Sequence, residues 1–300
     1  MARIVDELQN IADKLANLNI IVNMPAPDPL NIKVVDYDGI PIGLKHVNNK
    51  IHVSSMPYVY DIAEGNVPNH FSHSSFGRAF NVNQTEIELW KVGGAYKFPG
   101  TPMRMQVVSS SSNDSPSGSG VRQVEIYYLD NNYVEHTELI NLNGTTPVNT
   151  AAANILRVND FHATDAGSNK CSAGNIDIKN LAGTETYSRI SAARNASLQA
   201  IWKVPDGCTL YLTAWKCGAF LTQGKISFIM LRTTSDHGGN LTSGLFMHKD
   251  IVSVYNNHAF VPFSAPIKVP SRADVKLTGY ADRSDSVATI SGGFEGWYEI

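Results

Sequence analysis

The chain has 300 residues, of which 43% are hydrophobic and 17% are charged. Such a chain can bury a sizeable core, either in one large β domain or in two ordinary ones. The net charge is −3 and lysines and arginines form no cluster, so we expect no nucleic-acid partner. Apolar runs of about eighteen residues are lacking, and Asp6 and Glu7 stand where a signal peptide would be cationic. We therefore expect synthesis in the cytoplasm and no membrane partner.

A short helix is predicted over residues 1–24. Its apolar residues recur at alternating spacings of four and three, which is the pattern of a heptad seam, and they are Ile4, Leu8, Ile11, Leu15 and Leu18. A helix with so short a seam is only marginally stable by itself. It therefore lies on its own domain, packs against identical helices of sister chains, or anchors the chain in a larger assembly. We favour a homo-oligomer, with a trimer as the expected count, and assign these five residues to oligomerisation or anchoring.

Residues 25–102 are predicted to be an irregular connector that contains one small hairpin unit. Apolar runs at 32–35 and 50–55, separated by Asp38-Gly39 and Asn48-Asn49, indicate the hairpin. The stretch 57–80 keeps neither the helical nor the strand period, so we expect it to lie against a partner surface or over the β domain. The aromatic residues expected to seat the chain on a partner or on sister subunits are Tyr58, Tyr60, Phe71, Phe76, Phe80 and Trp90.

A long β-hairpin is predicted from Val121 to Val148. Val124, Ile126 and Tyr128 share one face of its first strand, and the second strand alternates in the same way. The turn between them, residues 130–132, is made of Asp and Asn, which tolerate left-handed backbone. Both faces carry apolar residues, so we expect the core to cover one face and a second sheet or another subunit to cover the other.

The β domain is predicted to span residues 103–300. Its strands are bounded almost throughout by Gly, Pro, Asn, Asp or Ser, and they are predicted at 103–109, 121–130, 133–142, 153–163, 174–180, 197–204, 208–217, 225–233, 244–254, 259–269, 273–281 and 287–299. No helical pattern separates them, so the predicted fold is mainly β, an antiparallel β-sandwich or jelly roll preceded by the short helix. The serine-rich stretch 109–120 is predicted to be a mobile loop that projects outward.

Sequence motifs of enzymes are lacking: we find no G-x-S-x-G, no glycine-rich phosphate loop with a lysine and no H-E-x-x-H. The carboxylate pairs Asp160 and Asp165, or Asp282 and Asp285, could in principle serve glycoside hydrolysis, but they lie in predicted loops where solvated turn residues are the norm. The segment 236–239 has the composition of a turn. We therefore predict that the protein is not an enzyme, and we name no catalytic residue.

Residues that often bind metals are scattered. His70 and His73 lack a third ligand nearby and are interpreted as ordinary loop residues. The cysteines are odd in number, lack metal-ligand spacing and are interpreted as buried thiols; they are Cys171, Cys208 and Cys217. We predict no metal site and no cofactor.

Several sequence segments, each of which combines a predicted turn with a predicted strand, occur in a definite order. They are GNVPNHFSHSSFGR (65–78), IELWKVGGAYKFP (87–99), VVSSSSNDSPSGSGVRQVEIYYLD (107–130), LNGTTPV (142–148), ILRVND (155–160) and LQAIWKVPDGCTLYLT (198–213). In order and spacing, over about two thirds of the chain, they resemble a group of virion structural proteins of tailed bacteriophages, abundant among aquatic phages. The resemblance implies an accessory β-sandwich protein of the virion, at the head surface, neck or tail. Its partners would then be a major capsid, portal, neck or tail protein.

Two roles follow from this resemblance. The first is a decoration or fibre-like protein attached to the head or neck through its N-terminal region. The second is a tail receptor-binding protein that mediates host adhesion by binding surface glycans, because exposed aromatic rings can stack on sugars. The aromatic candidates for that role are Tyr127, Tyr128, Tyr133, Trp202, Tyr211, Trp215, Trp297 and Tyr298. Aromatic residues on half-buried strands more often belong to a core or a subunit interface.

Overall fold

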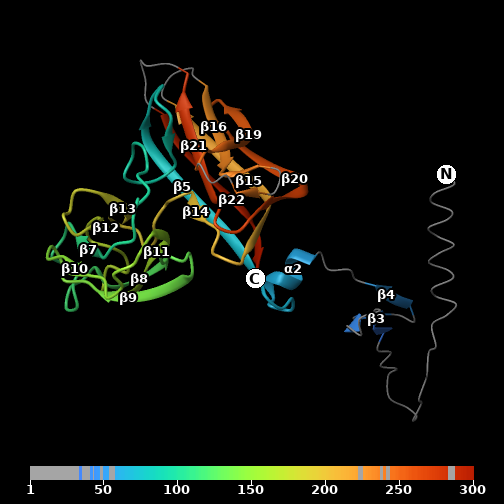
Figure 1. Cartoon of the computed structure of the whole chain (residues 1–300), viewed down its shortest axis with the longest axis horizontal. Coiled ribbons are helices and arrows are strands. Elements are labelled where there is room, and N and C mark those ends of the chain that lie inside the picture. The colour runs from blue at the N-terminus through green and yellow to red at the C-terminus, as the bar shows by residue number, and fades with distance from the viewer. Residues whose placement is uncertain are drawn as a thin grey trace, which may run out of the picture. The chain divides into compact units, whose positions relative to one another are not determined.

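The computed structural model describes residues 34–35, 41–42, 44–47, 50–53, 58–221, 226–236, 239–240, 244–282 and 288–300. The chain forms two compact units, Met1–Pro57 and Tyr58–Ile300 (Figure 1). In the first unit, β1 (Val34–Val35) pairs with β2 (Pro41–Ile42), and β3 (Leu44–Val47) pairs with β4 (Lys50–Val53). The two runs of the predicted small hairpin therefore belong to two separate pairs, 32–35 to the first and 50–55 to the second. The helix predicted over residues 1–24, with its five seam residues, lies outside the described residues.

The second unit contains a large sandwich of two antiparallel sheets, which we call the base sandwich. One sheet has the order β14-β21-β16-β19, with β6 also paired to β21, and the other has the order β20-β15-β22-β5. The strands are β5 (His70–Val82), β6 (Ile87–Glu88), β14 (Ile201–Lys203), β15 (Thr209–Leu221), β16 (Ser227–Thr233), β19 (Met247–Val254), β20 (His258–Val269), β21 (Asp274–Ala281) and β22 (Ala288–Glu299). Trp215, Leu277 and Phe294 lie among the fully buried residues between the sheets.

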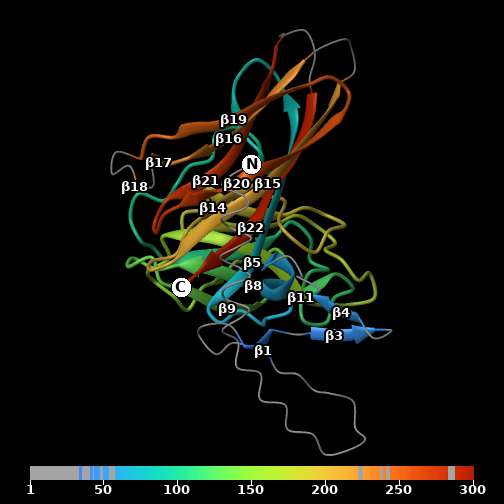
Figure 2. The same cartoon turned by 90° about the vertical axis from the view of Figure 1, so that its right-hand side faces the viewer.

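A second, smaller sandwich is inserted between β6 and β14, and we call it the insert sandwich. Its sheets have the orders β10-β7-β12-β13 and β11-β8-β9. The strands are β7 (Met105–Ser109), β8 (Val121–Leu129), β9 (Glu135–Asn141), β10 (Val148–Asn149), β11 (Arg157–Ala166), β12 (Ile176–Asn180) and β13 (Thr186–Ile190). It has a core of its own, in which Ile126, Phe161 and Ile176 are fully buried. Figures 1 and 2 show the insert sandwich mainly in green and yellow, and the base sandwich with β5 in cyan and its C-terminal strands in orange and red.

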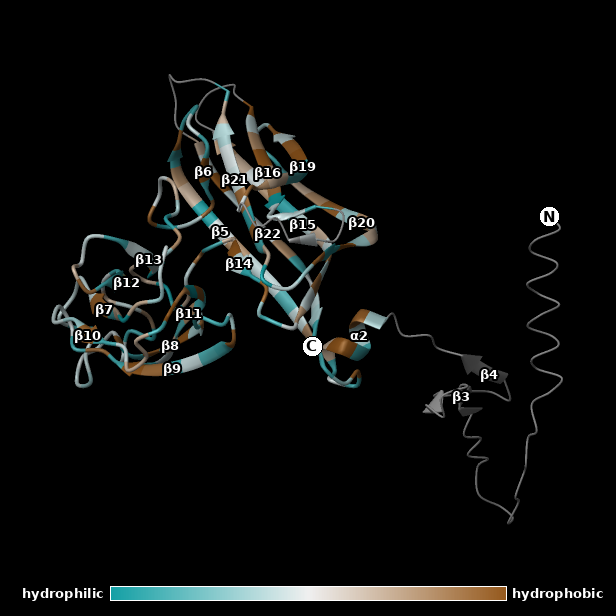
Figure 3. Ribbon diagram, in the orientation of Figure 1, coloured by the Kyte–Doolittle hydropathy of each residue, from teal (hydrophilic) through white to brown (hydrophobic). Residues whose placement is uncertain are grey.

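The mainly β, antiparallel fold class predicted from the sequence is confirmed. Each of the twelve predicted strands overlaps a strand of the structure. The strands of residues 103–300 nevertheless divide between two sandwiches, and the base sandwich also takes β5 and β6 from before residue 103. Figure 3 shows hydrophobic residues distributed over the strands of both sandwiches, as two separate cores require.

The prediction of an irregular connector is wrong for residues 70–82. This stretch is the thirteen-residue strand β5, which pairs with β22 from His70 to Val82. Its sequence lacks a clear period because its three phenylalanines, Phe71, Phe76 and Phe80, do not all share one face and stand among serine and histidine residues. Its strand conformation follows from the ladder to β22, which supplies backbone hydrogen bonds whatever the side chains are.

The predicted hairpin is present as β8 and β9, which pair from Gln123 to Leu129 with Asn141 to Glu135. Val124, Ile126 and Tyr128 are buried on one face, as expected. The left-handed residue of the turn is Tyr133, with φ of 65°, and not one of residues 130–132. Asp130 instead shapes the turn through its side chain, because Asp130 Oδ1 accepts hydrogen bonds from the backbone N–H groups of Asn132 and Val134.

The prediction of an outward, mobile loop at 109–120 is wrong in its central part. Asp114 is 0% exposed, and the stretch folds around its carboxylate. Asp114 Oδ2 accepts hydrogen bonds from Ser109 Oγ at 2.6 Å and from the backbone N–H of Gly174 at 2.9 Å. Asp114 Oδ1 accepts hydrogen bonds from the N–H groups of Val121 and Ala173, both at 2.8 Å. Four donors satisfy the buried carboxylate and tie the loop to the insert sandwich.

Smaller elements complete the second unit. Helix α2 (Tyr58–Ala63) precedes β5, and the short strands β17 (Ser235–Asp236) and β18 (Gly239–Asn240) pair with each other. Among the described residues, no helix has the length and hydropathy needed to cross a membrane. Cys208 and Cys217 are buried free thiols, and burial raises the pKa of Cys217 to about 12.

Candidate functional site at the junction of the two sandwiches

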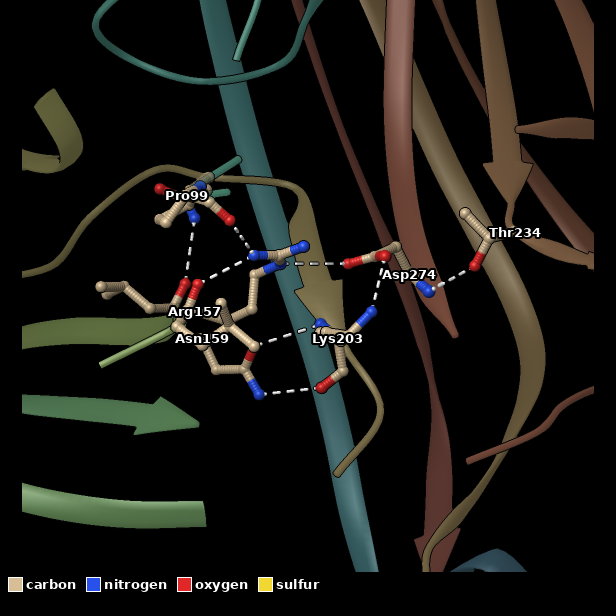
Figure 4. Close-up of polar contacts among 9 residues, drawn as sticks. Pro99, Arg157, Asn159, Lys203, Thr234 and Asp274 are labelled. Atoms are coloured by element: carbon tan, nitrogen blue, oxygen red, sulfur yellow. Dashed lines mark hydrogen bonds and ion pairs between the residues drawn. The ribbon is translucent and has the colours of Figure 1, made fainter. Parts of the chain in front are cut away.

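A polar lock joins the insert sandwich to the base sandwich. Asn159 on β11 donates from Nδ2 to the carbonyl oxygen of Lys203 on β14 at 2.9 Å, and the Lys203 N–H donates to Asn159 Oδ1 at 3.1 Å. The two hydrogen bonds run side by side (Figure 4). Because a side-chain amide here pairs with backbone as a neighbouring strand would, it fixes the position of β11 against β14.

A chain of charged groups extends the lock into the base sandwich. Lys203 Nζ donates to Asp274 Oδ2 at 2.8 Å, and the Asp274 N–H donates to Thr234 Oγ1 at 2.8 Å. Arg157 Nη1 donates to the carbonyl oxygen of Pro99 at 3.0 Å, and Arg157 Nε lies 3.7 Å from Asp274 Oδ1 (Figure 4). Burial lowers the pKa of Lys203, while the Asp274 carboxylate opposes that shift. The lock therefore holds the two bodies in one orientation, since breaking it would leave a buried charge unpaired.

A second buried ion pair lies close to this lock. Lys276 Nζ donates to Glu88 Oε1 at 2.7 Å, and Glu88 Oε2 accepts a hydrogen bond from the N–H of Tyr96 at 2.9 Å. Tyr96 packs against Trp90 and Ile201 in a small hydrophobic cluster. Trp90 is 4% exposed, so this predicted anchoring residue lies inside its own chain and is not available to a partner.

A cleft of about 440 Å³ lies beside the lock, between β5 and the insert sandwich. Five consecutive residues of β5, 72–76, form one wall. The residues of the insert sandwich that line the opposite wall are Tyr127, Glu135, Asn159 and Asp160, and the chain from Ser197 to Gln199, with Trp202 and Tyr298, completes the lining. The cleft was not foreseen from the sequence because it needs β5 as a strand and the insert as a separate body.

The cleft is acidic and partly aromatic. Burial raises the pKa of Glu135, and the nearby Asp160 carboxylate raises it further. A hydrogen bond from Asn159 lowers the pKa of Glu135 in part. Neither lysine nor arginine occurs among the residues that line the cleft. His73 lies against Trp202, with ring centroids 4.2 Å apart, and burial lowers the pKa of His73 to about 4, so its imidazole is neutral at pH 7.

The other predicted anchoring aromatics of the described part of the chain lie at the start of the second unit, on α2 and β5. Tyr58, Tyr60, Phe71, Phe76 and Phe80 are between 41% and 57% exposed.

Three of these aromatics also make contacts within the chain, and Phe71 stacks on Tyr298 with ring centroids 5.3 Å apart. Tyr58 Oη lies 2.9 Å from His70 Nε2, and its ring meets Trp297 edge to face. Phe80 lies under the cationic groups of Arg78 and Lys91.

The aromatic residues proposed for glycan contact do not form one platform. Tyr127, Trp202 and Tyr298 line the cleft, whereas Tyr211 stacks on Trp297 near α2. Trp215 and Tyr128 belong to the two cores, and Tyr133 lies under Lys203 and Arg272 at the junction.

The described residues hold no group of three or more His, Cys, Asp or Glu side chains that could bind a metal ion. His70 pairs with Glu299 at 3.1 Å, whereas His73 packs among aromatic rings.

Comparison with known proteins gives only weak structural similarity, to virus particles. No protein-family model matches the sequence, and no curated protein matches it. A structure of the infectious bursal disease virus Gx strain is 9% identical, with a TM-score of 0.20 over 81% of this chain and 76% of that chain. The VP2 subviral particle of the same virus is 10% identical, with a TM-score of 0.13 over 82% of this chain and 87% of that chain. Such scores do not define a shared fold, and the fold class rests on the strand pairing described above.

Proposed function

We propose that this protein is a structural component of a tailed-phage virion, made in the cytoplasm of the bacterial host. On this proposal it is an accessory protein, a decoration or fibre-like protein attached to the head or neck through its N-terminal region. The sequence segments that resemble virion proteins of tailed phages support this proposal. Two closed β cores joined by a buried polar lock also suit a protein that must keep its shape outside the cell.

The assignment of attachment to the N-terminal region rests on the position of the exposed aromatic residues. Tyr60 on α2 is 57% exposed, and Phe71 on β5 is 44% exposed, both close to the boundary with residues 1–57. Large aromatic residues that stay exposed are typical of protein interfaces, where each can contribute about 2 kcal/mol once desolvated. Other virion proteins and sister subunits, in a trimer by preference, are the proposed partners.

Particle incorporation tests this proposal. A protein that lacks residues 1–57 keeps every strand of both sandwiches, and we expect it to fold and yet fail to join virions that lack the wild-type protein. The double variant Tyr60→Ser/Phe71→Ser should be incorporated poorly as well. Leu139→Ser, which changes a residue of the insert sandwich that is 56% exposed, is the matched control and should be incorporated normally. Normal decoration by residues 58–300 alone would refute N-terminal attachment.

Tail receptor binding through host glycans is the second candidate function. It is favoured by the partly exposed rings of Tyr127 and Tyr298 in the cleft. Binding of the isolated protein to host cells or to a glycan array separates the two, because a purely structural decoration should bind the particle and not the cell.

A further inference from the structure

The edge of β5 that faces the cleft is open. β5 is the last strand of its sheet, and within the described residues it pairs only with β22. The cleft is lined by residues 72–76 without interruption. Side chains of successive strand residues alternate between the two faces of a sheet, so a cavity that touches five in a row runs along the strand edge.

The outward hydrogen-bonding groups of this edge can be identified. The backbone N–H of Arg78 donates to the carbonyl oxygen of Leu198 at 3.4 Å and so points away from β22. The backbone carbonyl oxygen of Asn69 instead accepts a hydrogen bond from the N–H of Ile300, which directly follows β22, and so points toward β22. Backbone groups two residues apart point in the same direction, and the register between residues 70 and 78 has no bulge. The N–H and C=O groups of Ser72, Ser74 and Phe76 therefore point away from β22, into the cleft.

The opposite wall determines the charge of a ligand. Glu135 and Asp160 are carboxylates, and no lysine or arginine lines the cleft. Both oxygens of Asp160 are engaged, because Oδ1 accepts a hydrogen bond from the N–H of Phe161 and Oδ2 lies 3.0 Å from His162 Nδ1. Negatively charged side chains in a binding site favour a cationic partner and disfavour an anionic one.

We propose that this cleft binds an extended cationic segment of another polypeptide as an additional strand on β5. The backbone of the segment would pair with Ser72, Ser74 and Phe76, and a lysine or arginine side chain would reach Glu135. Five strand residues span about 16 Å, which sets the length of the recognised segment at four to five residues. The inference concerns a binding site and is independent of the proposed place of the protein in a virion.

Fluorescence anisotropy with a labelled nine-residue peptide of alternating lysine and valine tests the proposal on the full chain. We expect saturable binding to the wild-type protein, and none for the same peptide with glutamate in place of lysine. A peptide with N-methyl groups on its central backbone nitrogens cannot donate the hydrogen bonds of a ladder and should also fail to bind.

Protein variants locate the site. Ser74→Pro removes one outward N–H and should weaken binding of the lysine–valine peptide about fivefold or more, whereas Ser74→Ala keeps that N–H and should bind normally. Glu135→Gln should weaken binding about threefold or more, and the control Asp165→Asn, an exposed carboxylate on β11, should not. Thermal melting of each variant verifies folding, and the N-methylated peptide repeats the test without any change to the protein.

Three outcomes would overturn the proposal. The first is equal binding of the methylated and unmethylated peptides, which would mean that no strand is added. The second is an equal loss for Ser74→Ala and Ser74→Pro, which would assign the contact to the hydroxyl group. The third is absence of peptide binding together with Glu135-dependent binding of neutral oligosaccharides, which would make the cleft a saccharide site.

Discussion

His73 on β5 is a histidine that packs among aromatic rings. As a loop histidine it would titrate near pH 6.5 and do little. On β5 its ring lies against Trp202 and Phe294, and burial lowers its pKa to about 4. Folding therefore disfavours the protonated imidazole, because burial removes water from its charged form.

The low pKa of His73 predicts a loss of stability in acid. Between about pH 6.5 and pH 4 the unfolded chain binds a proton at His73 and the folded chain does not, so the free energy of unfolding falls as the pH is lowered through this range, by about 3 kcal/mol in total. The variant His73→Phe cannot titrate there. Urea unfolding at about pH 7.5 and pH 4.5 should show a smaller loss for the variant than for the wild type. Equal losses would contradict burial of the neutral ring.

At the scale of elements, the serine-rich stretch after β7 is organised by one acidic side chain. Its composition is that of a flexible linker, and composition alone could not reveal that Asp114 collects four hydrogen bonds from three separate segments. Gly120 and Gly174 allow this close approach, since a Cβ on Gly120 would collide with Asp114 Oδ1 and one on Gly174 with Ser110.

Removing this carboxylate should destabilise the insert sandwich. Asp114→Ala leaves the N–H groups of Val121, Ala173 and Gly174 without their acceptor, and we expect a loss of about 3 kcal/mol or more in the free energy of unfolding. Asp165→Ala, which removes an exposed carboxylate from the same sandwich, should change it by less than about 0.5 kcal/mol. Urea denaturation followed by circular dichroism measures both variants. Similar values for the two would show that the Asp114 contacts contribute little.

At the scale of the whole molecule, the second unit consists of two sandwiches and carries exposed aromatic residues on α2 and β5. The chain before residue 57 carries the heptad seam, which together with the two-sided apolar hairpin at 121–148 predicts self-association. A helix with a seam of about two and a half heptads is marginally stable by itself, so its own domain, sister chains or a larger assembly would have to stabilise it.

Oligomerisation through the seam predicts a change of mass in solution. Leu8→Asp/Leu15→Asp places two charges on the seam and should convert the expected trimer to a monomer, because burial of unpaired carboxylates is strongly unfavourable. The off-seam pair Gln9→Asp/Ala16→Asp adds the same charge and should leave the trimer intact. Multi-angle light scattering distinguishes the two masses. A wild-type monomer, or a variant that stays oligomeric, would contradict the seam.

The sequence by itself determined the class of fold and the positions of most strands. Apolar residues with a period of two and turn residues at the ends are local signals, and each of the twelve predicted strands, 121–130 among them, overlaps an observed strand. It also pointed to aromatic residues as anchoring candidates. Those on α2 and β5 are exposed, whereas Trp90 is buried in a hydrophobic cluster.

Only the tertiary structure decided how those strands divide into two sandwiches. Which strands pair depends on contacts far apart in the chain, such as β5 with β22 and β6 with β21, and no local pattern encodes them. The Asn159–Lys203 lock and the cleft beside β5 exist only where the two bodies meet, so their residues carry ordinary local signals in the sequence. The sequence indicated Tyr127, Trp202 and Tyr298 as separate aromatic candidates, and only long-range pairing places them in one cleft.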